Sequence, residues 1–187
     1  MAKQTTRIMV LGVIAYRRPI SGYGIEKTLR EWAVDRWTTI APASIYQQLR
    51  SLSAAGLIEP VDDGTARAID YRCTGNGLHE LRRLLLALLN EQDFQPLSLI
   101  PLLHFTPSLT VEELVRGLRR RVAVIDQALS NEDEVMARSE ASGPSHVTEI
   151  FRLTWEGYRA DRDWCCGFLG RLGASGSGLK VRPNVYS

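Results

Sequence analysis

Residues 42–56, PASIYQQLRSLSAAG, carry side chains that could read the bases of duplex DNA. At 100° per residue on a helix, Ile45, Leu49 and Leu52 fall within about 60° of one another and predict a buried stripe. The opposite side is polar, with Tyr46 on its flank, and consists of Ser44, Gln47, Arg50 and Ser51. Glutamine can pair with adenine, and arginine with guanine or a phosphate. The alternative is a plain solvated helix face.

Hydroxyl groups near this segment could contact the DNA backbone, because neutral donors and helix N-termini often bind phosphates. The candidates are Ser21, Tyr23, Ser44 and Tyr46. Two arginines further along the chain, Arg67 and Arg72, could add phosphate contacts. Each of the four hydroxyl-bearing residues could equally be half-buried structure.

Hydrophobic spacing and capping signals predict the elements that must position these residues. A first helix is expected over 5–16, because a proline follows at residue 19 and disfavours helical geometry before it. Ser21 suits the N-cap of a second helix over 22–34, and Pro42 suits the first turn of the third. Two strands at 57–61 and 68–73, joined by a turn at 62–64, then complete a winged helix-turn-helix with a two-stranded wing.

The second half of the chain is predicted to be helical. Thr74 can cap a fourth helix, and Thr110 with Glu113 forms a capping box for a long helix to about residue 138. Along the long helix, apolar residues repeat at 4-3-4-3-4 spacing: Val111, Val115, Leu118, Val122, Ile125 and Leu129. A last helix is expected over about 146–172, followed by a flexible tail at 173–187.

We therefore predict a mainly α-helical protein with a DNA-binding domain at 1–90 and a helical dimerisation region at 91–172. The 4-3 seam of the long helix, together with Phe168 and Leu172 of the last one, is expected to form the homodimer. Helical hairpins bury such seams either against each other or against a second copy.

Aromatic residues of the last helix admit two interpretations. They are Phe151, Trp155, Tyr158 and Trp164. They could form a pocket near the dimer axis for a small aromatic or hydrophobic effector. Ordinary helix packing is the alternative, because aromatic residues at helical spacing usually make core.

Charge and composition restrict the classes of function that the chain could have. Residues 1–89 carry 12 Lys and Arg against 8 Asp and Glu, whereas residues 90–187 carry 11 against 13, so the basic half is the candidate surface for DNA. The sequence has no phosphate-binding loop, nucleophile elbow or HExxH motif, which argues against an enzyme.

The three cysteines and three histidines have no metal-ligand spacing, and we expect no cofactor. No apolar run reaches the roughly 18 residues of a membrane span and no signal peptide is evident, so we expect a cytoplasmic protein without a membrane partner.

With these pieces in order, the chain resembles the PadR family of bacterial transcriptional regulators. The resemblance is carried by SGYGIEKTL at 21–29, PASIYQQLRSLSAAGLIE at 42–59 and DYRCTGNGLHELRRL at 70–84, and it covers residues 5–90. Two features depart from the family: Ala41 stands where a Ser or Thr N-cap is expected, and the wing has few basic residues. Beyond residue 90 the architecture alone matches.

The resemblance implies double-stranded DNA binding as a dimer, usually with repression that a small molecule relieves. A different class of function is a dimeric winged-helix interaction module without sequence-specific DNA binding, which the weakly basic wing favours.

Overall fold

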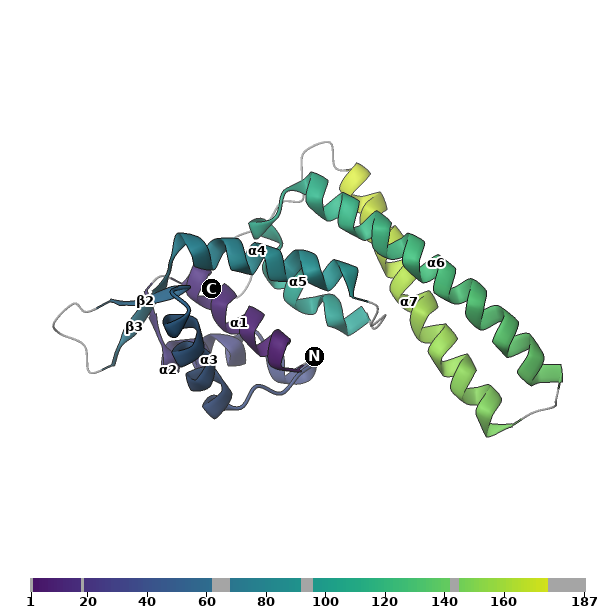
Figure 1. Cartoon of the computed structure of the whole chain (residues 1–187), viewed down its shortest axis with the longest axis horizontal. Coiled ribbons are helices and arrows are strands. Elements are labelled where there is room, and N and C mark those ends of the chain that lie inside the picture. The colour runs from purple at the N-terminus through teal and green to yellow at the C-terminus, as the bar shows by residue number, and fades with distance from the viewer. Residues whose placement is uncertain (1, 18, 62–67, 92–95, 142–144, 175–187) are drawn as a thin grey trace. The chain divides into compact units, whose positions relative to one another are not determined.

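The protein forms two compact units in a computed structural model, the first ending at Leu85 and the second starting at Leu86. The structure describes residues 2–17, 19–61, 68–91, 96–141 and 145–174. Figure 1 shows the chain as mainly helical with one small sheet, which confirms the predicted fold class. None of the helices in the described ranges is both long and apolar enough to cross a bilayer.

The first unit has the order of a winged helix-turn-helix. Its elements are α1 (Ala2–Tyr16), β1 (Ile20–Ser21), α2 (Gly22–Glu31), the 3-10 turn η1 (Val34–Arg36), α3 (Pro42–Ala54), β2 (Ile58–Val61), β3 (Asp70–Cys73) and the start of α4 (Gly75–Asn90). α1 packs against α2, α3 and β3, and Ile8, Leu11 and Ile14 of α1 have no exposed surface. The hydrophobic helix α1 therefore forms the centre of this core.

The sheet has three strands rather than the two that were predicted. β3 lies in the middle, antiparallel to both neighbours, in the order β1-β3-β2. The additional strand β1 is two residues long and pairs Ile20 with Tyr71 and Ser21 with Asp70. Two residues are too few for the alternation that identifies a strand in a sequence. The predicted turn at 62–64 and Arg67 lie outside the described residues.

α2 ends earlier than predicted, at Glu31 rather than at residue 34. Ala33 adopts a left-handed backbone conformation with φ of 51°, which is incompatible with continuing the helix. The predicted buried stripe is nevertheless present, because Ile25, Leu29 and Trp32 are all buried.

The second unit is built on a helical hairpin. It contains the end of α4, the 3-10 turn η2 (Pro96–Leu99), α5 (Ile100–His104), the 3-10 turn η3 (Thr106–Ser108), α6 (Val111–Ala141) and α7 (His146–Ala174). The predicted capping box is confirmed: the Thr110 amide donates to Glu113 Oε2 at 3.0 Å, and the Glu113 amide donates to Thr110 Oγ1 at 3.2 Å. α7 continues through Ala174, so the predicted tail boundary at residue 173 falls inside a helix.

The seam expected to join two copies faces largely into this unit. α6 and α7 lie side by side (Figure 1) and bury Leu118, Ile125, Phe168 and Leu172 within a single chain. Val111 is exposed, and Val115, Val122 and Leu129 are half-buried. A side chain that is fully buried in its own chain is not available to a second copy, so of the predicted seam only Val111, Val115, Val122 and Leu129 retain surface that a second copy could contact.

A buried ion pair joins α4, α6 and α7 in the second unit. Arg121 of α6 and Asp161 of α7 have no exposed side-chain surface, and the guanidinium donates to both carboxylate oxygens, at 3.1 and 2.6 Å. Arg121 Nη1 also donates to the carbonyls of Leu88 and Glu91, at 3.2 and 3.1 Å. Leu88 belongs to the last turn of α4 and Glu91 follows the helix directly, a place where carbonyls lack the regular helical donors. Arg121 therefore supplies the missing donors.

Removing the charge of Asp161 should destabilise the second unit strongly. In Asp161→Asn, the buried Arg121 guanidinium loses its counter-ion, and we expect a loss of about 3 kcal/mol in the free energy of unfolding, measured by urea denaturation. The double variant Arg121→Met, Asp161→Leu should recover part of this loss, although the carbonyls of Leu88 and Glu91 lose the guanidinium donor. Equal stability of Asp161→Asn and the unaltered chain would contradict this role for the pair.

Candidate nucleic-acid interface

α3 presents one apolar and one polar face, as predicted. Ile45, Leu49 and Leu52 are at most 3% exposed and face the core. Gln47, Arg50 and Ser51 are exposed, and Ser44 is half-buried. We call the residues Ser44, Gln47, Arg50 and Ser51 the reading face. It lies on the third helix of the unit, the position of the recognition helix in a helix-turn-helix.

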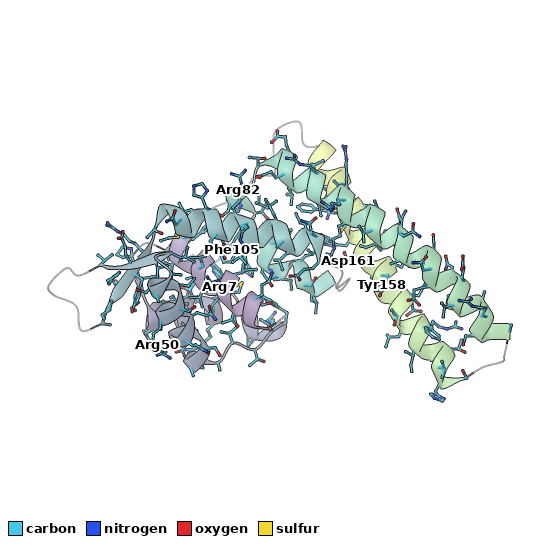
Figure 2. The ribbon with its side chains drawn as sticks, viewed as in Figure 1. Arg7, Arg50, Arg82, Phe105, Tyr158 and Asp161 are labelled. Atoms are coloured by element: carbon cyan, nitrogen blue, oxygen red, sulfur yellow. The ribbon has the colours of Figure 1, made fainter. Side chains whose placement is uncertain are left out.

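The charge of Arg50 is available on this face. Within the described part of the chain, the Arg50 guanidinium takes part in no ion pair or hydrogen bond, and the residue can be followed in Figure 2. The neighbouring Arg7 of α1 donates to Ser51 Oγ at 3.5 Å and lies 3.9 Å from the Glu80 carboxylate. A hydrogen bond from Arg83 lowers the pKa of Glu80 and keeps it charged. Glu80 thus partly neutralises Arg7, but not Arg50.

Tyr46 is held by the close approach of α2 and α3. A Cβ on Gly22, the first residue of α2, would lie 2.7 Å from Tyr46 Cε1, so the tyrosine ring rests directly on that glycine. The ring is still 47% exposed. Gly22 belongs to the segment 21–29 and Tyr46 to the segment 42–59 that the sequence analysis singled out. Their contact depends on how the two helices pack.

The start of α2 brings two further candidates to the same region. Ser21 caps α2 as predicted, and its Oγ accepts a hydrogen bond from the Gly24 amide at 3.1 Å. Tyr23 is 66% exposed, and no interaction engages its side chain within the described residues. Together with Tyr46, these residues place hydroxyl groups around a helix N-terminus, where backbone amides favour anions.

The wing contributes less positive charge than the sequence alone suggests. Arg72 Nε of β3 donates to Glu59 Oε1 of β2 at 2.6 Å, across a register that pairs these two residues. Both side chains are about half exposed, so solvent screens the pair, but Glu59 still offsets the charge of Arg72. Arg67 lies outside the described residues.

One residue of α3 does not follow the expected division. Gln48 is only 5% exposed, and its Oε1 has no hydrogen-bond partner within the described residues. On the helical wheel, residue 48 lies next to Leu52, so an inward position was readable from spacing. Its burial separates it from the adjacent Gln47, which points to solvent.

The aromatic residues proposed for effector binding belong to the second unit and make packing contacts there. All four are half-buried. The Trp155 indole N–H donates to Asp133 Oδ1 of α6 at 2.8 Å, and the Trp164 ring lies 5.1 Å from the ring of Phe168. These contacts favour the packing interpretation for Trp155 and Trp164.

Solved structures that match this chain include three of PadR from Bacillus subtilis. The complex with operator DNA is 19% identical, with a TM-score of 0.37 over 88% of this chain and 97% of that chain. The complex with p-coumaric acid is 17% identical, with a TM-score of 0.38 over 91% and 97%, and a third PadR structure is 19% identical, with a TM-score of 0.36 over 91% and 96%. No family model and no curated protein matches the chain. At this identity and these TM-scores, the function has to follow from the chain's own residues.

The contact between Gly22 and Tyr46 can be tested with a matched pair of glycines. Gly22 and Gly75 are the first residues of α2 and α4, and a Cβ on Gly75 meets nothing within 4 Å. Gly22→Ala must displace the Tyr46 ring, and we expect a loss of about 1 kcal/mol or more in unfolding free energy. Gly75→Ala should be neutral or stabilise by up to about 1 kcal/mol. Urea denaturation measures both, and equal effects would show that the ring does not depend on the glycine.

Proposed function

We propose that this chain is a DNA-binding transcriptional regulator that inserts α3 into the major groove. The observation that carries the proposal is the reading face, a polar and solvent-exposed surface on the third helix of a winged helix-turn-helix. Its composition suits base edges rather than phosphates alone, because Gln47 offers both a donor and an acceptor and Arg50 offers a planar fork of donors. We assign base readout to Gln47 and Arg50.

Backbone contacts are assigned to the hydroxyl groups around α2 and α3. Tyr23 and Tyr46 are exposed, and Ser21 and Ser44 lie at the starts of the two helices. Hydroxyls and helix N-termini fix a protein on the duplex without reading its sequence. Arg72, offset by Glu59, and Arg67 are assigned weaker phosphate contacts from the wing.

We further propose that the protein binds an inverted repeat as a two-fold dimer. Two recognition helices in successive major grooves require half-sites about 10 base pairs apart, or a multiple of that spacing. An apolar strip on α7 supports dimerisation, because Val147, Ile150 and Leu153 are 42, 59 and 74% exposed. As in regulators of the PadR type, we propose repression of target genes that a small hydrophobic or aromatic effector relieves.

The reading face predicts a loss of specificity when Gln47 is removed. Gln47→Ala should weaken binding to the selected operator by about 1–3 kcal/mol and leave binding to random duplex nearly unchanged, because a lost base-edge contact depends on sequence. The operator is first obtained by in vitro selection with the unaltered chain. Fluorescence anisotropy at fixed salt then gives both affinities.

Gln127→Ala is the matched control, because Gln127 is an exposed glutamine on α6. It should leave both affinities unchanged. If Gln47→Ala keeps the ratio of specific to random affinity, α3 does not read bases through this face. If no duplex binds above background at moderate salt, the alternative of a winged-helix interaction module is favoured instead.

The apolar strip on α7 predicts the oligomeric state. Replacing Ile150 and Leu153 together by Asp should convert a dimer to a monomer in sedimentation velocity, because the interface would have to bury two unpaired charges. Both residues are mostly exposed, so the helical content of the chain should be retained. Ile69→Asp, at a residue that is 61% exposed in the first unit, should remain dimeric. A dimer that survives the double substitution places the interface elsewhere.

A further inference from the structure

The N-terminal half of α1 brings an arginine to the edge of the reading face. Arg7 Nη1 donates to Ser51 Oγ at 3.5 Å, so its guanidinium lies beside a residue of that face. α1 and α3 pack against each other, and both Arg7 and Arg50 can be located in Figure 2. Arg7 thus carries a positive charge next to the surface that we assign to base readout.

The two sides of the reading face are covered by different helices. At 100° per residue, Ser51 lies about 40° from Gln47 in one direction, and Tyr46 lies about 100° from it in the other. The Tyr46 side rests on α2, whereas the Ser51 side faces Arg7 of α1. A major groove is bordered by a phosphate backbone on each side, so a helix inserted there has phosphates along both flanks.

The contacts that hold Arg7 within the protein are both long. Its Nε lies 3.9 Å from Glu80 Oε1, beyond hydrogen-bond distance, and its hydrogen bond to Ser51 has the longest length that still counts as one. Within the described residues, the Arg7 side chain has no other ion pair or hydrogen bond. Its side chain is 25% exposed, and pairs of this length between partly exposed groups contribute little. The guanidinium can therefore exchange its partners at small cost.

Glu80 of α4 is bound more closely by another arginine. Arg83 donates to both carboxylate oxygens, with its Nε 2.7 Å from Oε2 and its Nη2 2.9 Å from Oε1. The two residues are three positions apart on one helix, so this pair forms without any contribution from α1. The hydrogen bond from Arg83 lowers the pKa of Glu80, which stays negatively charged. Glu80 therefore attracts Arg7 without forming a hydrogen bond to it.

We propose that Arg7 contacts a DNA phosphate on the α1 side of the reading face, and that Glu80 competes with this phosphate for the Arg7 guanidinium. A phosphate offers charge-assisted hydrogen bonds that are shorter and stronger than the present contacts of Arg7. The contact raises affinity for every duplex, because a phosphate carries no base sequence. This inference deepens the proposed function and rests on it.

The salt dependence of DNA binding tests the phosphate contact. Arg7→Gln should weaken binding to the selected operator and to random duplex by the same factor, about fivefold near 0.1 M salt. It should also reduce the magnitude of the slope of log K against log salt by about one. Arg7→Lys keeps the charge and should restore the slope. Fluorescence anisotropy at several salt concentrations gives the affinities of all variants.

Two control variants separate this role from the alternatives. Arg159→Gln removes an arginine of the second unit whose Nε also lies 3.9 Å from a carboxylate, that of Asp163, and it should leave the slope unchanged. Ser51→Ala removes the hydroxyl group that Arg7 contacts but no charge, so it should also leave the slope unchanged. If Arg7 acted only by orienting Ser51, Arg7→Gln and Ser51→Ala would have equal effects on affinity and neither would change the slope.

A double-mutant cycle tests the competition by Glu80. Glu80→Gln should strengthen binding to random duplex by about threefold in the unaltered chain, because it releases the Arg7 guanidinium. In the Arg7→Gln background the same change should have an effect of less than about 1.5-fold, since the released group is absent. A carboxylate that repels DNA only from a distance would change affinity by the same factor in both backgrounds.

An unchanged salt slope in Arg7→Gln, a change in the ratio of operator to random affinity, or an equal effect of Glu80→Gln in both backgrounds would each overturn the inference. Arg7 and Glu80 are partly exposed, so the variants should keep the helical content seen by circular dichroism. If the unaltered chain binds no duplex even at low salt, the proposed function fails and this inference fails with it. If it binds duplex and Arg7→Gln keeps the original slope, the inference alone fails.

Discussion

The ion pair between Arg121 and Asp161 is the interaction on which the second unit depends. Two charged side chains without exposed surface are costly to remove from water, and this cost is recovered only when each finds several partners. Asp161 accepts two hydrogen bonds from the guanidinium, and the third nitrogen of Arg121 donates to the carbonyls of Leu88 and Glu91 at the end of α4. Cys165 lies beside the carboxylate, where burial raises the pKa of its thiol to about 12 and keeps it neutral. A shift of α4, α6 or α7 along its axis would break some of these hydrogen bonds, so the pair favours one register of the three helices.

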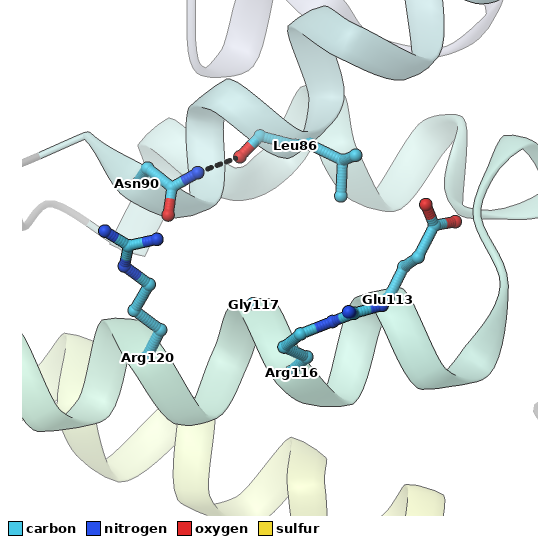
Figure 3. A pocket seen from close by; sticks show the side chains of 6 residues that line it. All are labelled: Leu86, Asn90, Glu113, Arg116, Gly117 and Arg120. Carbon is cyan, nitrogen blue, oxygen red and sulfur yellow. Dashed lines mark hydrogen bonds between the residues drawn. The ribbon is translucent and has the colours of Figure 1, made fainter.

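The Arg121–Asp161 pair also holds the C-terminal end of α4 in position. Its N-terminus is closed by Thr74, whose hydroxyl accepts from the Gly77 amide and donates to the carbonyl of Gly56 in the turn between α3 and β2. Its C-terminus is held by Arg121. One continuous helix is thus anchored at both ends by side chains from different parts of the chain. The anchored last turn presents Leu86 and Asn90 to a pocket of about 300 Å³ that α6 lines from the other side (Figure 3).

The position of the reading face depends on apolar packing rather than on a buried ion pair. α3 has no side-chain N-cap, since Ala41 makes no capping hydrogen bond, and its position comes from the buried stripe against α1 and α2. Within the part of the chain that the structure describes, the same packing leaves Gln47 and Arg50 without protein partners, while Arg72 and Arg7 lie near carboxylates. Side chains of this kind form hydrogen bonds with water in the free protein. They can exchange these bonds for hydrogen bonds with the edge of a base. This is why the proposed specificity is assigned to α3 rather than to the wing.

The sequence by itself determined the features that arise within a few residues of each other. The caps at Ser21, Thr74 and Thr110 and the two faces of α3 were all readable, because a helix places residues three and four apart on one side whatever surrounds it. The tertiary structure alone decided the rest. β1 exists because β3 offers it an edge, Tyr46 rests on Gly22 because α2 and α3 pack closely, and the α6 seam turned inward because α7 covers it. Arg121 and Asp161 lie 40 residues apart, and a charged residue on a helix is normally solvent-exposed. Only the packing of helices distant in sequence could bury both charges and make each the partner of the other.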